Sequence, residues 1–376
     1  MLGLFSCSYE GSQLHDTLPK LKIEEAFSQK KYIKLSEFTQ GDIEYIMLET
    51  TGESLIGPHP RFYADNKHIL ALTYNQMLVF DRNTGQFIRQ IGSQGREPGG
   101  YMSTLFTYPY DESMNLLFAQ GWKQGTYLAY DIYGNLKTQF TPREGNISMA
   151  PMNDTSYVAY IKNFSGTEKE KLVVYNNQNN KIRTFPNYRE AEKPENEMFW
   201  LPTQGWFYRY NDKLCFYELY TDTIFQVTVD ELIPRFVFDL GDFAPPYEKQ
   251  SLGEFIRDEL KNYYQPAMIF ETRNYVVFQI LHERMTHLVT YNKETEEIAF
   301  AESAEGFEND LDNFIPMNYN FLNSYGELIG FAEAYKIQQW FEDNPDKAAK
   351  LPPHLKRLEN LTENDNPVVM IAKLKE

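Results

Sequence analysis

The chain has 376 residues, enough for a large hydrophobic core in one domain or in several. Asp and Glu number 53 against 36 Lys and Arg, so the net charge is −17, which repels phosphate backbones and argues against a nucleic-acid partner. Aromatic residues make up 15% of the chain, a share that excludes disorder. No run of about 18 apolar residues could cross a bilayer as a helix.

The amino terminus resembles the end of a bacterial lipoprotein signal, in which a small residue precedes a cysteine that is lipidated. Leu4, Ser6 and Cys7 match that pattern. Residues 1–40 are therefore predicted to form a lipoprotein-like tether or arm, lipidated at Cys7, and this lipid would be the contact with a membrane. Too few residues precede Cys7 for the apolar segment of a signal peptide, so this interpretation needs a start upstream of Met1. The alternative is an ordinary thiol in a frayed terminus.

A strand-and-turn pattern recurs along the chain. In the clearest copies an apolar run ends in an aromatic residue and then Asp or Asn, and turn-forming residues such as Thr84 and Gly85 follow. Asp and Asn bond their own backbone, and Gly tolerates the positive φ of tight hairpins. Six copies are anchored at these positions: Phe80, Tyr130, Tyr175, Phe225, Tyr291 and Ile371. The first three intervals are close to the ~40–50 residues of a propeller blade.

The last two intervals are longer, and each is predicted to contain a helical insertion. Residues 251–264 place several apolar side chains on one face at helical spacing. Residues 334–361 carry further apolar positions, with breaks at Pro345 and Pro352. Without these insertions the period returns, so the sequence predicts an all-β fold, a six-bladed β-propeller.

The two ends of the repeat array predict how the ring closes. The last copy, residues 368–373, is followed by no outer strand, while residues 43–49 form a predicted strand with no blade of their own. Pairing the two removes an exposed edge and joins the first blade to the last. Residues 41–376 are therefore predicted to be one propeller domain closed by a strand from the N-terminus.

Several motifs spread over nearly the whole chain carry a family resemblance: Leu48-Glu49-Thr50, Ser54-Leu55-Ile56-Gly57, Val79-Phe80-Asp81, residues 87–101 and residues 366–370. With them the chain resembles the Bacteroidetes-type six-bladed β-propeller lipoproteins, which look like distant relatives of NHL-repeat propellers. It departs from that family at residues 97–101, Glu-Pro-Gly-Gly-Tyr, where the family usually has Gly-Pro-Gly-Glu-Tyr. The resemblance implies a cell-envelope location, as an outer-membrane lipoprotein or a periplasmic protein, and no established activity.

A ligand site is predicted on one face of the propeller. Connections between blades and those joining second to third strands share a face, and binding residues concentrate on such loops. That face would carry both helical insertions and these candidate ligand-binding residues: Arg61, Arg96, Trp122, Lys123, His282 and Arg284. Because Arg presents a planar fork to carboxylate or phosphate, a carboxylated or sulfated ligand would fit. The alternative is that these cations form surface ion pairs worth at most about 1 kcal/mol each.

Other chemistry-bearing residues have plainer explanations. His282 and His287 lack the adjacent Glu or third histidine of a metalloprotease motif. The acidic residues between Glu302 and Asp312 could ligate calcium, but they lack the spacing of a known calcium loop, so a solvated loop is preferred. Cys215 lies in an apolar strand and is predicted to be inert core.

Three functions remain open on the sequence alone. The first is a binding module on the cell envelope that recognises a glycan, a peptide or a partner protein, without catalysis or cofactor. The second is a lactonase-like hydrolase or lyase with a divalent metal such as calcium in the central channel, which would need three or four ligands converging there. The third is a purely structural role, with the helical insertions docking another subunit. Fold analogy alone does not choose among them.

Overall fold

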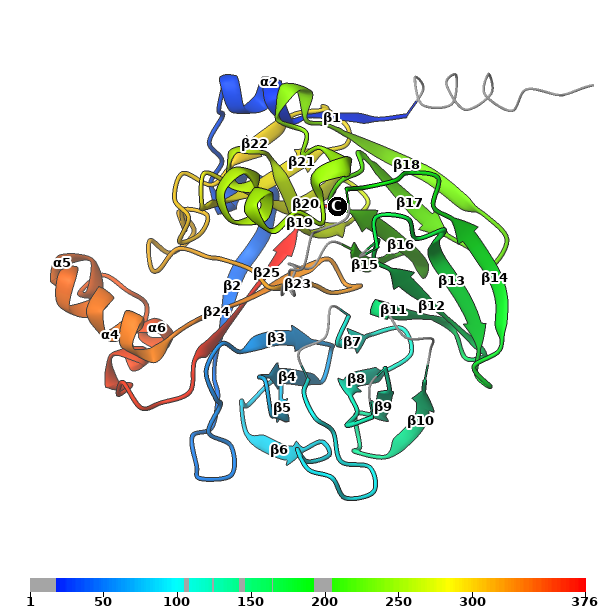
Figure 1. Ribbon diagram of the computed structural model, residues 1–376. Coiled ribbons are helices and arrows are strands. Elements are labelled where there is room, and N and C mark those ends of the chain that lie inside the picture. Colours follow the sequence, from blue (N-terminus) through cyan, green and yellow to red (C-terminus); the bar gives the residue numbers. More distant parts are fainter. Residues whose placement is uncertain (1–17, 105–107, 124, 142–145, 164, 193–204) are drawn as a thin grey trace, which may run out of the picture.

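A computed structural model describes residues 18–104, 108–123, 125–141, 146–163, 165–192 and 205–376. Within these residues the strands form six sheets arranged as a ring (Figure 1). Each sheet contains four antiparallel strands ordered from the channel outward, and one sheet has a fifth strand on its outer edge. The predicted six-bladed β-propeller is confirmed.

The blades follow one another in chain order. Blades one and two comprise β3 (Arg61–Ala64), β4 (His68–Leu72), β5 (Met77–Asp81), β6 (Phe87–Gln90), β7 (Tyr110–Asp111), β8 (Leu116–Gln120), β9 (Tyr127–Asp131) and β10 (Leu136–Phe140). Blades three and four comprise β11 (Asn146–Asn153), β12 (Ser156–Ile161), β13 (Glu170–Asn176), β14 (Lys181–Pro186), β15 (Gly205–Tyr210), β16 (Lys213–Glu218), β17 (Thr223–Val227) and β18 (Leu232–Asp239). Blades five and six comprise β19 (Gln265–Glu271), β20 (Tyr275–His282), β21 (Met285–Asn292), β22 (Ile298–Phe300), β23 (Phe321–Leu322), β24 (Glu327–Ala332), β25 (Val368–Leu374) and β2 (Thr39–Met47).

The repeated sequence pattern marks the third strand of every blade, since its six anchors lie in β5, β9, β13, β17, β21 and β25. In blades one and two, the side chain of an Asp organises the turn that follows this strand. Asp81 Oδ1 accepts hydrogen bonds from the backbone N–H groups of Asn83 and Thr84, at 3.0 and 2.9 Å. Asp131 makes the same kind of turn after β9. This local chemistry explains why the period could be found in the sequence.

The ring closes through the N-terminal strand, as predicted. β2 pairs antiparallel with β25, with Tyr45 opposite Met370 and Ile46 opposite Val369, and the two strands lie side by side (Figure 1). β2 thereby supplies the outer strand of blade six. Gly85 of blade one has φ +70°, and a Cβ there would collide with the Met47 carbonyl, so the turn of blade one packs closely on the closing strand.

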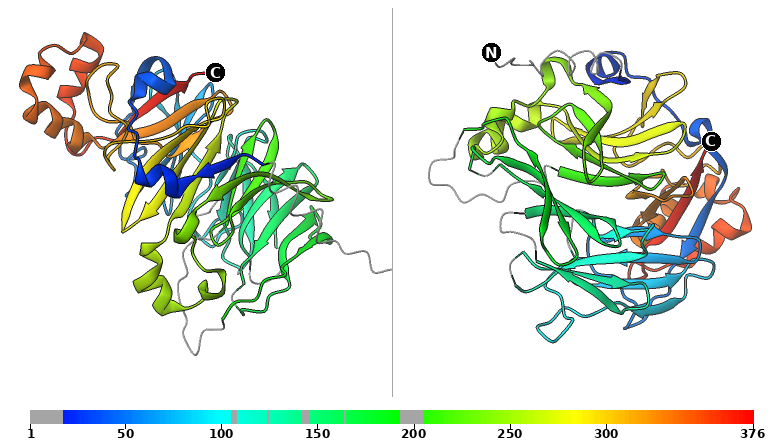
Figure 2. Two further views of the ribbon diagram at one scale, coloured as in Figure 1. Left: turned by 90° about the horizontal axis from the view of Figure 1, so that it is seen from above. Right: turned by 90° about the vertical axis from the view of Figure 1, so that its right-hand side faces the viewer.

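The described part of the predicted arm runs along the outside of the ring (blue in Figure 2). It contains β1 (Lys20–Lys22), α2 (Ile23–Ser28) and α3 (Leu35–Phe38). β1 pairs in parallel with β18 of blade four, and the Ile33 N–H then donates to the Phe300 carbonyl of blade five at 2.9 Å. Cys7 lies outside the described residues, and its lipidation stays a prediction.

Both predicted insertions are present. The first, between β18 and β19, is a chain of short turns: η1 (Gly241–Phe243), η2 (Tyr247–Lys249), η3 (Phe255–Glu259) and η4 (Leu260–Asn262). The second, between β24 and β25, contains α4 (Ala334–Asp343), α5 (Pro345–Ala348), α6 (Pro353–Lys356) and η5 (Arg357–Asn360). No helix among the described residues is long and apolar enough to cross a membrane.

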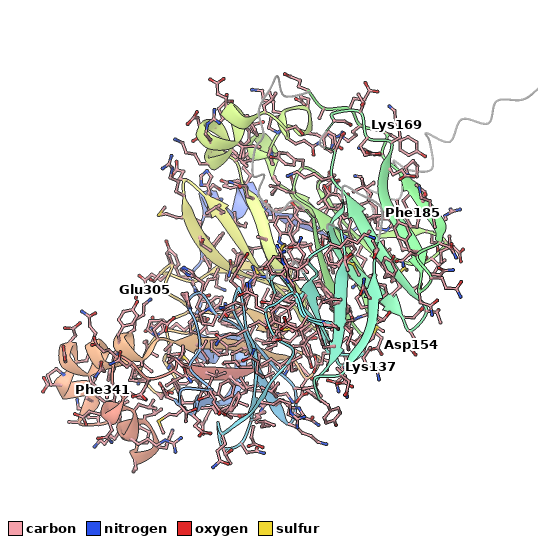
Figure 3. All side chains as sticks on the ribbon, turned by 60° about the horizontal axis from the view of Figure 1, so that its bottom comes forward. Lys137, Asp154, Lys169, Phe185, Glu305 and Phe341 are labelled. Atoms are coloured by element: carbon pink, nitrogen blue, oxygen red, sulfur yellow. The ribbon has the colours of Figure 1, made fainter. Side chains whose placement is uncertain are left out.

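The hydrophobic core lies between neighbouring blades and beneath the second insertion. Phe118, Tyr157 and Phe216 belong to one cluster that joins blades two, three and four. Phe341 of α4 joins another cluster that continues into blades five and six. Figure 3 shows Phe341 on the insertion, at one side of the molecule, while Lys137 lies in the outer strand of blade two. A ring held by such packing fixes the inner strands, which surround the channel.

Candidate binding site in the central channel

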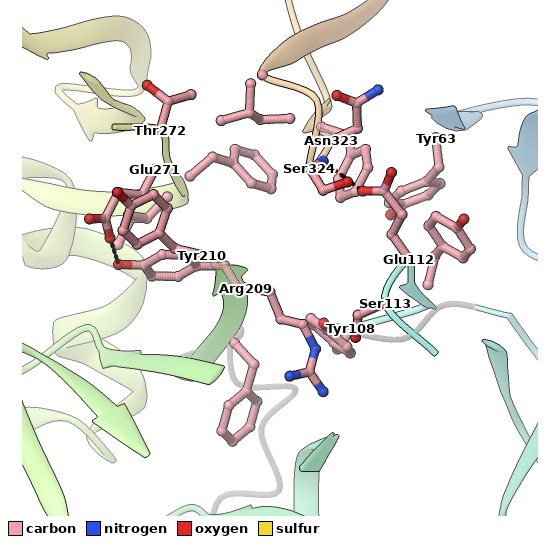
Figure 4. A pocket seen from close by; sticks show the side chains of 18 of the residues that line it. Tyr63, Tyr108, Glu112, Ser113, Arg209, Tyr210, Glu271, Thr272, Asn323 and Ser324 are labelled. Atoms are coloured by element: carbon pink, nitrogen blue, oxygen red, sulfur yellow. Dashed lines mark hydrogen bonds between the residues drawn. The ribbon is translucent and has the colours of Figure 1, made fainter. Parts of the chain in front are cut away.

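A cavity of about 770 Å³ lies where the inner strands meet (Figure 4). Most of its lining comes from β3, β7, β15, β19 and β23 and from residues next to these strands. Because the lining includes turn residues such as Ser113, Asp212 and Arg273, the cavity reaches the face where first strands turn into second strands. Because successive strands are antiparallel, this face is opposite the one that carries the insertions. The sequence had predicted the ligand site on the insertion-bearing face.

One wall of the cavity carries charges that are already paired. The Asp111 side chain is fully buried, and its Oδ2 accepts hydrogen bonds from Arg209 Nε at 2.6 Å and Tyr108 Oη at 2.9 Å. Ser113 donates to the other carboxylate oxygen at 2.7 Å. Arg209 also donates to the Pro151 carbonyl at 2.7 Å, so this pair ties blades two, three and four together. Removal of one partner of such a buried pair leaves the other as an uncompensated buried charge, which strongly destabilises the folded protein.

A second paired carboxylate lies between blades four and five. Glu271 Oε1 accepts from Arg235 at 2.5 Å and from Lys293 at 2.6 Å. Tyr208 donates to the other carboxylate oxygen at 3.3 Å. Burial lowers the pKa of Lys293 despite the neighbouring Glu271. Arg235 lies over the Tyr210 ring at 5.3 Å from its centre, a cation–π arrangement. We call the side chains of Tyr108, Arg209 and Glu271, with these partners, the paired wall.

The side of the cavity at Glu112, across from Glu271, is different (Figure 4). Glu112 accepts one hydrogen bond, from the Ser324 N–H to Oε2 at 2.7 Å (Figure 4). Its Oε1 is buried and has no hydrogen-bond partner among the described residues, and the same holds for the Tyr110 hydroxyl and for Asn320 Oδ1. Burial, together with the carboxylates of Asp65 and Glu327, raises the pKa of Glu112.

Aromatic rings surround these oxygens. Tyr63, Tyr110 and Phe321 contact one another, with ring centres 5.7, 4.9 and 6.2 Å apart. Phe270 from blade five extends the group, 5.8 Å from Phe321. We call Tyr63, Tyr110, Glu112 and Phe321 the open wall. It combines flat apolar surfaces with hydrogen-bonding atoms, which is the usual composition of a small-ligand site.

The structure separates the six residues predicted to bind ligand. Among them Arg61 alone lines the described cavity, where it lies close to Tyr63 and offsets part of the rise in pKa that burial gives that tyrosine. Arg96 lies over the Trp122 ring at 4.9 Å, and Trp122 Nε1 donates to the Gly95 carbonyl. Lys123 follows Trp122 in an exposed turn. These three residues form a separate surface group between blades one and two.

His282 and Arg284 lie elsewhere again, at the β20–β21 turn of blade five. Arg284 is exposed, with φ 66°. The His282 ring packs against Phe27 of the N-terminal arm and Tyr264, at 5.7 and 4.7 Å between ring centres. Burial lowers the pKa of His282 and takes that of His287 to about 4, so both rings are neutral near pH 7. Their surroundings are those of structural histidines.

The residues that sequence reasoning missed share one position. Glu112, Arg209 and Glu271 all lie at or just after the end of an innermost strand. A charged residue near the end of a short aromatic strand was a visible signal, as in Tyr208-Arg209-Tyr210. Among the described residues no three His, Cys, Asp or Glu side chains are grouped so as to hold a metal ion. The lactonase-like alternative stays a prediction without a candidate ligand set in that part of the chain.

The comparisons with known proteins fit this architecture. A family model described as "Domain of unknown function (DUF4934)" matches residues 18–373, and the chain belongs to that family. The crystal structure of a "putative exported protein" from Bacteroides fragilis NCTC 9343 superposes with a TM-score of 0.69 at 15% identity. That match covers 96% of this chain and 100% of the other. At this identity the likeness concerns the fold alone.

Weaker structural matches are not informative. A streptogramin B lyase matches with a TM-score of 0.37 at 10% identity, over 71% of this chain and 74% of the other. The extracellular domain of a hybrid two-component system from B. thetaiotaomicron matches with a TM-score of 0.36 at 13% identity, over 68% of this chain and 31% of the other. No curated protein matches.

Proposed function

We propose that the protein is a non-catalytic binding module of the cell envelope that holds part of a glycan or a peptide in its central cavity. The observation that carries the proposal is the cavity of about 770 Å³, which five blades line with aromatic rings and hydrogen-bonding groups. Its volume falls in the range of about 300–1,000 Å³ that small-ligand sites occupy. Tyr and Trp rings offer flat faces to sugar rings or peptide side chains, with a polar tip for hydrogen bonds.

The rigidity of the site supports the same proposal. The paired wall ties blades two to five together through buried charged hydrogen bonds, so the lining residues are held before any ligand arrives. A preformed site loses less side-chain freedom on binding than a flexible one. In propellers, function depends on the residues of such a site and not on the fold itself.

Ligand binding is testable with a panel of neutral oligosaccharides, amino sugars and short peptides, measured by isothermal titration calorimetry. Ser113→Trp places a large ring at the exposed cavity rim, and we expect it to abolish binding of any panel member that the wild-type protein binds. Ser93→Trp is the matched control, because Ser93 lies in the loop between blades one and two. Retained binding by Ser113→Trp, or no binding in the whole panel, would contradict the proposal.

The envelope location is part of the proposal, supported by the likeness to an exported protein and by the resemblance of residues 4–7 to a lipidation site. Expression from the native gene in the presence of an alkyne fatty acid tests it. We expect Cys7→Ser to lose the label and to leave the membrane fraction. Cys215→Ser should keep the label, because Cys215 is buried in β16. An unlabelled wild-type protein would refute lipidation at Cys7.

A further inference from the structure

The open wall contains two oxygen atoms from neighbouring positions that lack hydrogen-bond partners among the described residues. These are the Tyr110 hydroxyl and Glu112 Oε1. Tyr110 is 2% exposed, and both residues line the cavity. Glu112 directly follows β7, and its carboxylate is close enough to contribute to the raised pKa of Tyr110, after burial and Asp65. Unpaired polar atoms in such a place are costly unless something binds them.

The missing partner is a hydrogen-bond donor. A carboxylate oxygen accepts hydrogen bonds, and a tyrosine hydroxyl can accept as well as donate. Asn320 Oδ1 is a further unpartnered acceptor in the cavity lining, contributed by blade six. A ligand that brings acceptors alone, such as a carboxylate or a sulfate, would leave Glu112 unpaired and would face its charge.

The negative charge around Glu112 favours a hydrogen-bond donor that is itself positively charged. The strongest influences on the pKa of the Glu112 carboxyl are burial, the backbone and side chain of Ser324, and the carboxylates of Asp65 and Glu327. None of these groups is a cation. Asp111 and Glu271, by contrast, have Arg209, Arg235 and Lys293 against them. The other two carboxylates of the described cavity lining, Asp212 and Glu376, are exposed to solvent. Glu112 is therefore the partly buried lining carboxylate whose charge a ligand would have to balance.

The rings of the open wall fit a cation for an independent reason. Tyr63, Tyr110 and Phe321 form a mutual cluster with ring centres 4.9 to 6.2 Å apart. The negative π face of such rings attracts an ammonium group at about 6 Å or less from the ring centre. A primary ammonium also carries three donors, which suits a wall with several free acceptors.

We propose that the open wall is a subsite for a protonated primary amine, with Glu112 Oε1 as its counter-ion and the Tyr110 hydroxyl as a second acceptor. This inference rests on the proposed function and names the ligand chemistry of the same cavity. An amino sugar with a free amino group and a peptide with a free amino terminus share this chemistry. N-acetylation removes the charge from either and leaves the rest of the molecule in place.

Calorimetric titration with two matched pairs of probes tests the subsite. The first pair is a trimer of glucosamine and a trimer of N-acetylglucosamine, and the second is tri-alanine and N-acetyl-tri-alanine. We expect the free-amine member of one pair to bind, and its acetylated partner to bind at least about tenfold more weakly, because an unbalanced buried charge costs more than 1.4 kcal/mol. Which pair responds distinguishes the two sources of the amine.

Variants of the two acceptors complete the experiment. Glu112→Gln keeps an oxygen for the Ser324 N–H and removes the charge, so we expect at least about a tenfold loss of affinity for the amine. Tyr110→Phe keeps the ring and should lose less, about threefold to tenfold. Glu359→Gln is the matched control on the exposed surface of η5 and should bind as the wild type does. Circular dichroism establishes that each variant is folded.

The outcomes separate this inference from the proposed function. Equal binding of amine and acetylated probes, with no effect of Glu112→Gln or Tyr110→Phe, would overturn the amine subsite and leave the cavity as a binding site. Binding by acetylated probes alone would do the same. No binding by any probe would overturn both.

Discussion

The two walls of the central cavity differ in how completely their polar groups are satisfied, although they begin at adjacent residues. Asp111 ends β7 and Glu112 directly follows it. Asp111 has hydrogen bonds from Arg209, Tyr108 and Ser113, whereas Glu112 has one, from the Ser324 backbone. The polar groups of the paired wall are satisfied within the protein, whereas the open wall retains described polar atoms without a partner, which we propose a ligand uses.

Both walls cost free energy to bury, but the cost is offset differently. On the paired wall the attraction between opposite charges and the additional hydrogen bonds offset the desolvation of both groups. On the open wall the Glu112 carboxyl is desolvated with little in return, which is why its pKa is raised. Binding sites commonly retain such unfavourable groups, because the ligand supplies the missing interaction. Substitutions on the two walls should therefore have opposite consequences.

The largest expected effect is at the centre of the paired wall. Asp111→Asn removes the charge that faces Arg209 and leaves the buried guanidinium unbalanced, so we expect a loss of about 3–5 kcal/mol in the free energy of unfolding. Urea denaturation followed by tryptophan fluorescence measures it. A loss below about 1 kcal/mol would mean that the pair does not hold blades two and four together.

The two buried tyrosines beside β7 give a matched comparison of intermediate size. Tyr108 donates to the Asp111 carboxylate, so Tyr108→Phe should cost about 1.5–3 kcal/mol, the usual contribution of a hydrogen bond to a charged group. Tyr110→Phe removes a hydroxyl that has no described partner, so its effect on unfolding should be close to zero or slightly stabilising. The same denaturation experiment reports both, and equal losses would remove the distinction between the walls.

The smallest expected effect is on the pH dependence of Glu112→Gln. The pKa of Glu112 is raised in the folded protein, so the folded state holds this proton more tightly than the unfolded state does. The contribution of Glu112 to stability is therefore present at low pH and is lost as the pH rises through its folded pKa. We therefore compare the difference in melting temperature, Glu112→Gln minus wild type, at two pH values. This difference should be more positive at pH 7 than at pH 4. A difference that grows toward low pH would mean that the carboxylate stabilises the fold.

The fold was predictable because its information is local. The turn that Asp81 organises can be recognised within a few residues, and its recurrence gives the blade count. Closure followed from residues 43–49 lacking a blade and residues 368–373 lacking an outer strand. The insertions were visible as interruptions of the period, and the prolines that divide the second insertion lie at the starts of α5 and α6.

The cavity chemistry was much harder to predict because it depends on which blades face each other. Nothing in the order Tyr110-Asp111-Glu112 indicates that Arg209, nearly one hundred positions later, reaches Asp111 and not Glu112. Arg61, predicted on the insertion-bearing face, lines the cavity because it begins an innermost strand. Arg96, Trp122, Lys123, His282 and Arg284 lie on other loops, and ligand binding by them stays a prediction.

A crystal structure of the protein with the tightest-binding member of the ligand panel tests amine binding at the open wall most directly. We expect the ligand to lie in the central cavity, with a nitrogen within hydrogen-bonding distance of Glu112 Oε1 and the Tyr110 hydroxyl. A ligand bound instead on the insertion-bearing face, beside Arg96 and Trp122, with no ligand in the channel, would contradict it.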